Sequence, residues 1–397
     1  MSTTASGVAA GSRPLVVIHS VQWWLPQTAT WLYTQVQFLP ADVESHVACE
    51  RVAFLEQFPY PRLHCLLDYP NWRRVWDLAM RRLRFRNHLW FLYDTARRID
   101  ARVMHSHFGF TGWRDLEVAR RLQLAHVVTF YGIDVLRYPT KDPRWRDRYR
   151  EMFARVDAVL CEGPYMAKSI VALGCPESKV RVHHLGIDLT AIPFAPLAWT
   201  PGEPLRVLLS GVFREKKGFA YALEALGQIS NDVGLEITVI GDQHGGATLQ
   251  EKQRMLDAIA RHDLGSRTRF LGFQPYTVVM TEARRHHLFV SPSVVASDGD
   301  TEGGAPVSLI EMSATGLMIV STTHCDIPSV ILDGKTGLLA AERDIDGLVE
   351  RLRWLIANPS RWADMRAAGR AHVEEEFDAR RQGERLASIY RDVVRAS

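Results

Sequence analysis

Short apolar runs rich in β-branched residues alternate with segments of helical periodicity along almost the whole chain. Six such runs in the first half are predicted strands: Leu15–Ser20, His46–Arg51, Val103–Phe108, His126–Phe130, Ala158–Cys161 and Val180–His184. Most of them are unbroken rather than alternating, as expected for strands covered on both faces. Strands that alternate with helices are joined by crossovers, so the pattern predicts an α/β fold with parallel sheets.

A second series of the same kind follows a proline-rich stretch. Its predicted strands are Leu205–Ser210, Glu236–Gly241, Thr268–Phe273, Leu288–Pro292, Met318–Thr322 and Gly337–Ala340. Three helical stretches follow from Ile345 onward. The two series predict two doubly wound, Rossmann-like domains facing across a cleft, with the ligand outside the carboxyl ends of the strands.

The domain boundaries follow from these two series. We expect residues 1–14 to form a disordered lead-in, and residues 15–192 to form the first domain together with a returning last helix, 379–397. Residues 193–204 are the predicted linker, and residues 205–378 the predicted second domain. The length agrees, because 397 residues exceed what one hydrophobic core usually serves.

The composition is that of an ordinary globular protein, with 47% hydrophobic and 23% charged residues, which excludes disorder, coiled coil and collagen. No membrane-spanning apolar stretch and no signal peptide are visible, so we expect a cytoplasmic protein. The five cysteines are widely spaced, which predicts buried thiols rather than a disulfide framework or zinc site. The paired histidines lack carboxylates at useful spacing, so no metal is expected: His105 and His107, His183 and His184, His286 and His287.

Two of only seven lysines, Lys216 and Lys217, are adjacent in the segment 205–226. There a predicted strand ends at Gly211, and a loop that also holds Arg214 leads into a helix. Cations beside a helix N-terminus form a phosphate site, because charge and unpaired N–H groups converge there. A solvated basic turn is the alternative.

A second segment, residues 291–316, has a strand end followed by an acidic, glycine-rich loop. Glu302 stands at its far edge, and Glu311 falls one turn into the next helix, which Pro306 is placed to start. Gly303–Gly304 permits close approach of the backbone to a ligand. The two carboxylates can accept hydrogen bonds from sugar and ribose hydroxyls. Alternatively, they are a loop carboxylate and a helix-surface charge.

Together these segments resemble glycosyltransferase family 4, the retaining nucleotide-sugar transferases of GT-B fold. Further matches are HSHFG (105–109), VVTFYGIDV (127–135), CEGPYMAKSIVALGCPESKV (161–180), LGIDL (185–189), GLMIVSTTHCDIPSVI (316–331) and DGKTGLLA (333–340). The early WLPQTATWLYTQVQFL (24–39) is similar to the opening loop of the subgroup found in exopolysaccharide clusters. The resemblance covers roughly residues 15–395, with the motifs in the family's order and spacing.

The resemblance implies roles for the matching residues. Lys217 and Gly211 match the phosphate-binding loop, while Glu302 and Glu311 match the paired glutamates that contact the sugar and the ribose. The further residues expected at the nucleotide are Gly303, Gly304, Ala305, Pro306 and Val307. The residues expected at the acceptor or the sugar are Tyr131, Asp134, Thr28 and Thr30, with His107 as a catalytic candidate that orients the acceptor or sugar. For His107 the alternative is a histidine satisfied within the core.

The chain departs from the family pattern at four places, one of them Ser329, which follows Ile327-Pro328 where an acidic residue is usual. Val212 stands where the family usually has arginine, and we hypothesise that Arg214 reaches back to the diphosphate instead. Glu302 and Glu311 have eight residues between them rather than seven, and Tyr131 stands where histidine is common.

The reaction that the resemblance implies releases a nucleotide diphosphate from the anomeric carbon while an acceptor hydroxyl arrives on the same face. Preorganised cations stabilise the charge on the leaving phosphate, a role for Lys217 and Arg214. In this chemistry the leaving phosphate takes the acceptor's proton, and neither a metal nor another cofactor is required. Family usage favours a UDP-sugar as donor. The acceptor is a saccharide, a lipid-linked intermediate or a small-molecule alcohol.

The charges are distributed unevenly along the chain. Residues 1–198 carry 25 Lys and Arg against 18 Asp and Glu, whereas residues 199–397 carry 23 against 27. Residues 72–102 alone contain nine arginines, three aspartates and several aromatic residues. Such a basic, aromatic segment can lie at an anionic membrane surface. The alternative is an amphipathic helix that packs its aromatic residues inward. Nucleic acid is not expected as a partner, because the overall charge is near neutral.

Three other functions remain open from the sequence. A nucleotide-sugar epimerase shares the two-domain plan but needs an acid/base set at the sugar ring. A two-domain solute-binding protein does not need the loop at Lys217. A transferase-like subunit that has lost activity is consistent with Val212 and Tyr131.

Overall fold

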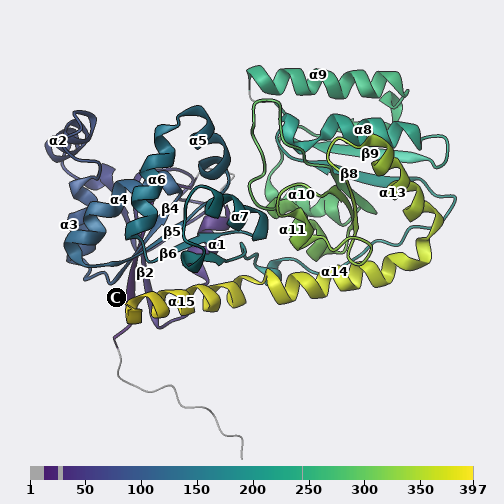
Figure 1. Ribbon diagram of the computed structural model, residues 1–397. Coiled ribbons are helices and arrows are strands. Elements are labelled where there is room, and N and C mark those ends of the chain that lie inside the picture. The colour runs from purple at the N-terminus through teal and green to yellow at the C-terminus, as the bar shows by residue number, and fades with distance from the viewer. Residues whose placement is uncertain (1–12, 26–29, 244, 397) are drawn as a thin grey trace, which may run out of the picture. The chain divides into compact units, whose positions relative to one another are not determined.

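The computed structural model describes residues 13–25, 30–243 and 245–396. Its strands form two parallel sheets, with orders β3-β2-β1-β4-β5-β6-β7 and β10-β9-β8-β11-β12-β13 (Figure 1). The strands of the first sheet are β1 (Leu15–Trp24), β2 (Val43–Val52), β3 (Leu63–Cys65), β4 (Val103–His107), β5 (Ala125–Thr129), β6 (Ala158–Cys161) and β7 (Val180–Val182). Those of the second are β8 (Leu205–Ser210), β9 (Leu235–Ile240), β10 (Thr268–Phe270), β11 (Leu288–Ser291), β12 (Met318–Thr322) and β13 (Leu338–Ala340). The predicted fold class is confirmed.

Helices connect the strands in both sheets. In the first half they are α1 (Thr30–Gln37), α2 (Asn71–Arg82), α3 (Trp90–Arg98), α4 (Gly109–Leu122), α5 (Tyr138–Lys141), α6 (Arg144–Arg155) and α7 (Pro164–Ala172). In the second half they are α8 (Phe219–Gln228), α9 (Gly246–Arg261), α10 (Tyr276–Ala283), α11 (Val307–Thr315), α12 (Ile327–Val330), α13 (Ile345–Ala357), α14 (Trp362–Glu376) and α15 (Ala379–Ala396).

The twelve predicted strands are confirmed, with end shifts of a few residues. The additional strand β3 was not predicted, because its three residues, LHC, are too few to show a period. The three predicted C-terminal helical stretches are α13, α14 and α15.

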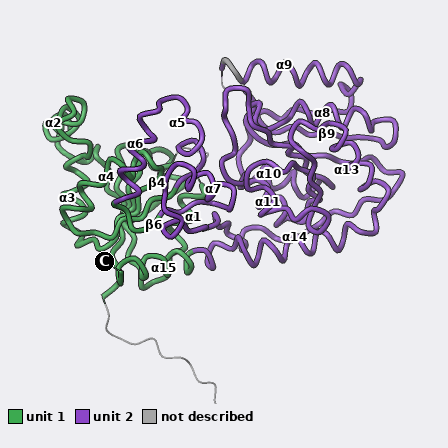
Figure 2. Tube along the Cα trace, in the orientation of Figure 1, with its two compact units in different colours: residues 1–129, 155–158, 383–397 green, residues 130–154, 159–382 purple. Residues whose placement is uncertain are grey.

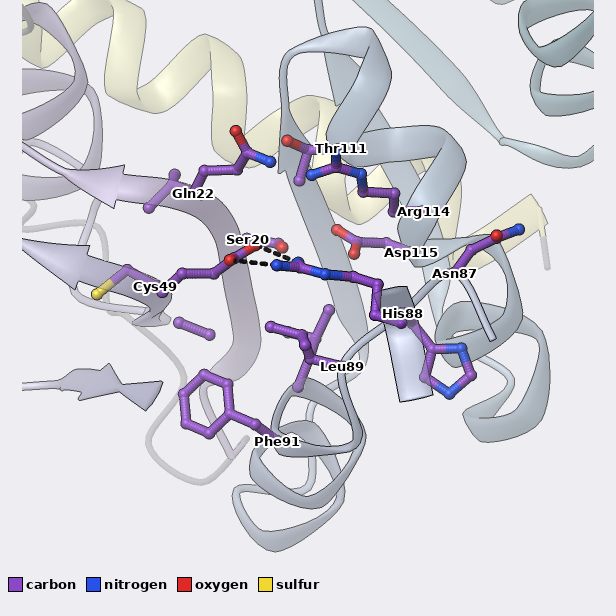
Figure 3. A pocket seen from close by; sticks show the side chains of 15 residues that line it. Ser20, Gln22, Cys49, Asn87, His88, Leu89, Phe91, Thr111, Arg114 and Asp115 are labelled. Carbon is purple, nitrogen blue, oxygen red and sulfur yellow. Dashed lines mark hydrogen bonds and ion pairs between the residues drawn. The ribbon is translucent and has the colours of Figure 1, made fainter. Parts of the chain in front are cut away.

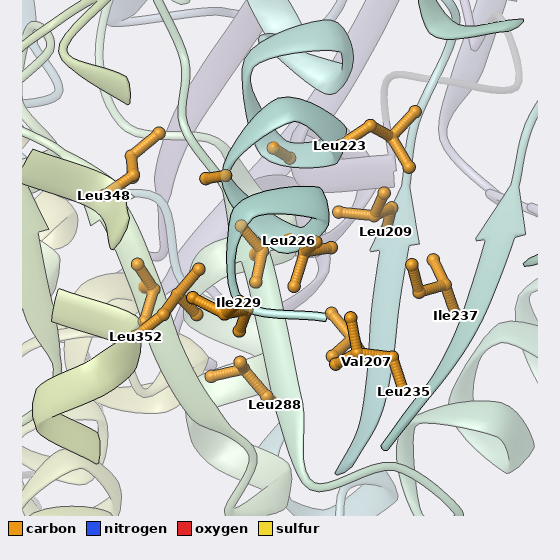
Figure 4. Close-up of a cluster of buried hydrophobic side chains, with 14 of the residues drawn as sticks. Val207, Leu209, Leu223, Leu226, Ile229, Leu235, Ile237, Leu288, Leu348 and Leu352 are labelled. Atoms are coloured by element: carbon orange, nitrogen blue, oxygen red, sulfur yellow. The ribbon is translucent and has the colours of Figure 1, made fainter. Parts of the chain in front are cut away.

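The second sheet is covered on both faces, which explains its unbroken apolar strands. Alternate residues of one strand enter different cores: Val207 and Leu209 of β8 lie in one cluster, and Leu208 lies in the other. Figure 4 shows the first of these cores, where Leu223 and Leu226 of α8 meet the strands. The carboxyl ends of β8, β11 and β12 are thereby fixed at one edge of this sheet.

Two compact units divide the chain (Figure 2). One comprises residues 1–129, 155–158 and 383–397, and the other comprises residues 130–154 and 159–382. Most of α15 therefore returns to the first unit, where Tyr390 bonds to His105. This confirms the predicted return of the last helix. The domain boundaries themselves stay a prediction.

Two further expectations concern cysteines and membrane spans. The thiols are free, with Cys325 half-buried and the other four buried, close to the prediction. Among the residues that the structure describes, no helix is long and apolar enough to cross a membrane.

Candidate functional site

The predicted phosphate loop follows β8 and ends at Gly218, where any other residue would be strained. Gly218 has φ +68°, and a Cβ there would lie 1.9 Å from the carbonyl oxygen of Pro292. A single 3₁₀ turn, Glu215–Lys217, precedes it, and α8 begins directly after it. Lys217 therefore lies at the N-terminus of a helix, where the helix dipole favours an anion.

The acidic loop between β11 and α11 ends in a second helix N-terminus. Pro306 precedes the first residue of α11, which confirms the expected helix start. Within the described part of the chain, no group accepts a hydrogen bond from the N–H groups of Gly304 and Ala305. Backbone donors of this kind at a helix start are suited to phosphate oxygens.

Lys217 and Glu302 form an ion pair that joins these two loops. The distance from Lys217 Nζ to Glu302 Oε1 is 3.0 Å, and Ser293 Oγ donates to the same carboxylate over 3.2 Å. Burial alone would raise the pKa of Glu302, but the ammonium groups of Lys217 and Lys216 hold it below its usual value. The two residues that the sequence singled out separately are thus in direct contact.

Arg214 and Lys216 share a different carboxylate, that of Asp300. Arg214 Nη1 lies 3.3 Å from Asp300 Oδ2, and Lys216 Nζ lies 3.4 Å from Oδ1. Lys216 also donates to the carbonyl oxygen of Thr301 over 2.8 Å. Three cations therefore gather on one side of the acidic loop. The reach of Arg214 to a diphosphate stays a prediction, because here its partner is Asp300.

Glu311 lies on α11, as expected from the sequence, and faces Tyr276 of α10. Burial raises the pKa of Glu311 to about 7, against the opposing effect of a hydrogen bond with the Tyr276 side chain. The carboxyl group is thus partly protonated near neutral pH. Its expected contact with ribose therefore depends on pH.

Tyr131 and Asp134 belong to the same unit as the two loops. The Tyr131 N–H donates to Asp134 Oδ1 over 3.0 Å. Between them, Gly132 has φ +104°, and a Cβ there would lie 2.4 Å from the Cα of Gly303. The structure therefore brings the predicted acceptor segment against the predicted donor loop within this unit.

Glu162 belongs to this site and was not predicted. A Cβ on Gly304 would lie 2.0 Å from its Oε2. Burial and then the carboxylates of Asp326, Asp134 and Glu302 raise the pKa of Glu162 well above its ordinary value. Its position directly after β6, at a strand's carboxyl end, was the signal that could have found it.

His324 is a second residue that sequence reasoning missed. It is fully buried beyond β12 and accepts a hydrogen bond from the backbone N–H of Glu302 over 3.2 Å. Its other ring nitrogen lies 2.8 Å from Glu342 Oε1. The same carboxylate accepts from the backbone N–H of Val295 over 2.8 Å. His324 and Glu342 thereby tie down both ends of the acidic loop.

His107 lies in the first unit, fully buried at the end of β4. Its Nε2 is 3.0 Å from Nδ1 of His19, and its ring stacks on His105. In the described residues, His19, His105 and His107 are the one group spaced to hold a metal ion. Both nitrogens of His105, however, already bond to Tyr390 and to Thr129. The acceptor-orienting role of His107 stays a prediction.

The last two predicted residues are threonines. Thr30 is the exposed first residue of α1, and its carbonyl oxygen accepts from the Thr34 hydroxyl. Thr28 lies outside the described residues. The sugar contacts of Thr28 and Thr30 stay predictions.

The first unit has a small pocket of its own, lined by polar and apolar residues and shown in Figure 3. Its volume of about 30 Å³ suits roughly two water molecules. Its lining includes the ion pair of Arg81 with Glu50 and the side chain of Asp115. None of the predicted site residues lines it.

Two family descriptions match the chain: "Glycosyltransferase Family 4" over residues 28–191 and "Glycosyl transferases group 1" over residues 199–372. The amylovoran biosynthesis glycosyltransferase AmsK of Erwinia amylovora is 33% identical over 289 residues, covering 71% of this chain and 68% of that protein. The putative colanic acid biosynthesis glycosyltransferase WcaL of Escherichia coli K12 is 29% identical over 296 residues, covering 73% and 70%.

Among solved structures, Anabaena HepE in complex with UDP and glucose is similar with a TM-score of 0.73. The match covers 95% of this chain and 100% of that chain, at 13% sequence identity. At this identity the likeness concerns the fold alone.

Proposed function

This chain belongs to the glycosyltransferases of group 1 and family 4 and has their GT-B fold, and on that basis we propose that it is a retaining hexosyltransferase. The donor is a nucleotide diphosphate sugar, with a UDP-sugar favoured, and the transferred group is a hexose or amino-hexose. The acceptor is a hydroxyl of a saccharide intermediate in polysaccharide synthesis, lipid-linked or free.

The observation that carries this proposal is the position of Lys217. Its ammonium lies at the N-terminus of α8 and is held by Glu302 at 3.0 Å, on the loop that leads into the N-terminus of α11. A diphosphate leaving group needs cations and N–H donors placed before the reaction begins. Lys217, Gly304 and Ala305 offer both kinds of group.

The remaining residues have supporting roles in the proposed reaction. Arg214 adds a second cation at the diphosphate, Glu302 accepts from a sugar hydroxyl, and Glu311 accepts from the ribose hydroxyls. Tyr131 and Asp134 contact the sugar or the acceptor. The leaving phosphate takes the acceptor's proton, so no metal ion is part of the proposal.

The proposed place of reaction is the cytoplasm, at the inner face of the membrane when the acceptor is lipid-linked. AmsK and WcaL, by their names, act in the biosynthesis of amylovoran and colanic acid. Polysaccharides of this kind are the first acceptor class to test.

A panel of nucleotide sugars tests the function. Purified protein is incubated with UDP- and GDP-sugars, with and without EDTA, and nucleotide diphosphate release is measured. Release from one donor that survives EDTA, and that is lost in Lys217→Ala, is the expected result. Sugar epimerisation without release would indicate the epimerase instead, and tight binding without turnover would indicate an inactive subunit.

A further inference from the structure

Helix α2 exposes its apolar face and buries a polar residue, the reverse of an ordinary surface helix. Surface helices of globular proteins bury their apolar stripe and expose their polar face. In α2, Trp72 is 68% exposed and Trp76 is 61% exposed, with Val75 exposed between them, whereas Asp77 is only 4% exposed. The residues at 72, 75 and 76 share one helix face by their spacing. That apolar face points to solvent.

The polar face of α2 is fixed to the rest of its unit. Asp77 accepts from the N–H groups of Trp90 (2.7 Å) and Phe91 (2.9 Å), at the start of α3, and pairs with Arg86. Arg81 makes two bonds of 2.5 and 2.7 Å to the carboxylate of Glu50, drawn as dashed lines in Figure 3. The helix therefore cannot roll its aromatic face inward without breaking a partly buried ion pair and the bonds of Asp77.

The apolar surface continues beyond the helix and carries positive charge. Leu83 and Phe85, which is 72% exposed, extend it toward α3. Residues 71–90 contain six arginines and one carboxylate, the buried Asp77. Arg82 and Arg84 are exposed and form no ion pair with any residue that the structure describes. We name Trp72, Val75, Trp76, Leu83 and Phe85, with Arg82 and Arg84, the α2 surface.

We propose that the α2 surface docks on an anionic lipid membrane. Tryptophan and phenylalanine on one face with arginines beside them are the composition of helices that lie in the headgroup region. Arginines without an ion-pair partner gain free energy at a negative membrane surface potential. A second copy of the chain is a poor occupant, because a two-fold contact would place this positive surface against itself.

The biological use of this surface rests on the proposed function, in which the acceptor can be carried on a lipid. The binding itself does not, since it needs no turnover. A failed flotation experiment and a failed transferase assay can therefore be told apart. The alternative that the aromatic residues of 72–102 pack inward is wrong for α2, although it holds for Phe91 of α3, which is buried.

Vesicle flotation of the full chain tests the proposal. We expect the protein to float with vesicles of phosphatidylcholine containing about 30% phosphatidylglycerol, to float little with phosphatidylcholine alone, and to be released by salt. Arg82→Gln/Arg84→Gln should weaken partitioning about 30-fold, from two arginines lost. Trp72→Ala/Trp76→Ala should abolish flotation.

The matched control is Trp354→Ala, at an exposed tryptophan of α13 in the other unit, which should float like the wild type. All variants should retain transfer to a soluble acceptor. The proposal is overturned if the wild-type protein does not float, if it floats equally with both vesicles, or if the α2 variants float unchanged. It is likewise overturned if sedimentation shows a dimer that only the α2 variants lose.

Discussion

The backbone N–H of Glu302 donates to Nε2 of His324 over 3.2 Å. An acceptor at Nε2 leaves the proton of the neutral ring on Nδ1, which lies 2.8 Å from the Glu342 carboxylate. The imidazole therefore acts as a fixed link between Glu342 and the acidic loop. Glu302 in turn holds Lys217. His324 therefore positions two side chains that we expect at the donor, while we do not expect His324 itself to touch the donor.

The first prediction concerns this link. His324→Ala should lower kcat about 100-fold, because a loop displaced by about 1 Å misplaces Lys217. Glu342→Gln should have a smaller effect, since its amide oxygen still accepts from Nδ1 and only the bond from the Val295 N–H is lost. Steady-state kinetics of the two variants make the comparison, and circular dichroism spectra that match the wild type show that the variants are folded. Activity within twofold of wild type in a folded His324→Ala protein would contradict the positioning role.

Loss of the lysine ammonium is the second prediction. Lys217→Ala should lower kcat by about 10²–10³, the usual effect of removing one preorganised group at a developing charge. Lys335→Ala removes an exposed lysine from a turn of the same unit and serves as the matched control, with unchanged kinetics expected. Donor turnover is the measurement for both. Equal rates in the two variants would remove Lys217 from the proposed mechanism.

Arg214 is the subject of the third prediction. If it reaches the diphosphate, Arg214→Ala should raise the donor KM and lower kcat, each by roughly tenfold, about 1.4 kcal/mol. Because Asp300 also pairs with Lys216, that carboxylate keeps a partner in the variant. Unchanged activity and donor affinity would mean that Arg214 only anchors the loop.

Much of the fold was predictable because parallel strands covered on both faces are unbroken apolar runs. Strand β8 was predicted with its observed bounds, and Gly218 indicated where the loop after it ends and the next helix begins. What periodicity could not supply was the orientation of α2. Its spacing left open whether the aromatic or the polar side faces inward. Asp77, which accepts from an N–H group at the start of α3, and Arg81, which pairs with Glu50 of β2, hold the polar side inward.

The candidate site was predictable where a residue type suggested chemistry by itself, as with Lys217 and Glu302. Glu162 and His324 were missed although both follow the carboxyl ends of strands, the edge where open α/β sheets bind ligands. Both lie in segments that match the family, 161–180 and 316–331, but their residue types did not single them out, and their place in the topology is the further signal. A search of the first residues after each predicted strand would have found both.

The fourth prediction is a pH dependence of donor binding. Burial raises the pKa of Glu311 to about 7, so about a tenth of the carboxyl groups are ionised at pH 6 and about nine tenths at pH 8. If ribose hydroxyls donate to the carboxylate, the donor KM should fall by up to about tenfold over this range. Glu311→Gln should show a flat profile. The same slope in both proteins would assign the dependence to another group.

The last prediction concerns the stability of the first unit. Asp115 is buried with its carboxylate accepting from Ser106 Oγ over 2.7 Å, and burial raises its pKa from 3.8 to about 7. Between pH 4 and 7 the unfolded chain loses this proton while the folded chain keeps it. Folding therefore becomes less favourable as pH rises, by roughly 1.4 kcal/mol per pH unit, and the cost levels off above pH 7.

Asp115→Asn keeps an oxygen for the serine and removes the titrating group. The variant's free energy of unfolding relative to wild type should therefore rise by roughly 2–3 kcal/mol between pH 5 and pH 8. Urea unfolding of both proteins at the two pH values measures this difference, and effects of neighbouring groups such as His126 cancel where they titrate alike in both. A difference that does not change with pH would mean that Asp115 is ionised in the folded protein, with the hydroxyls of Ser106 and Ser20 sufficient to stabilise its charge.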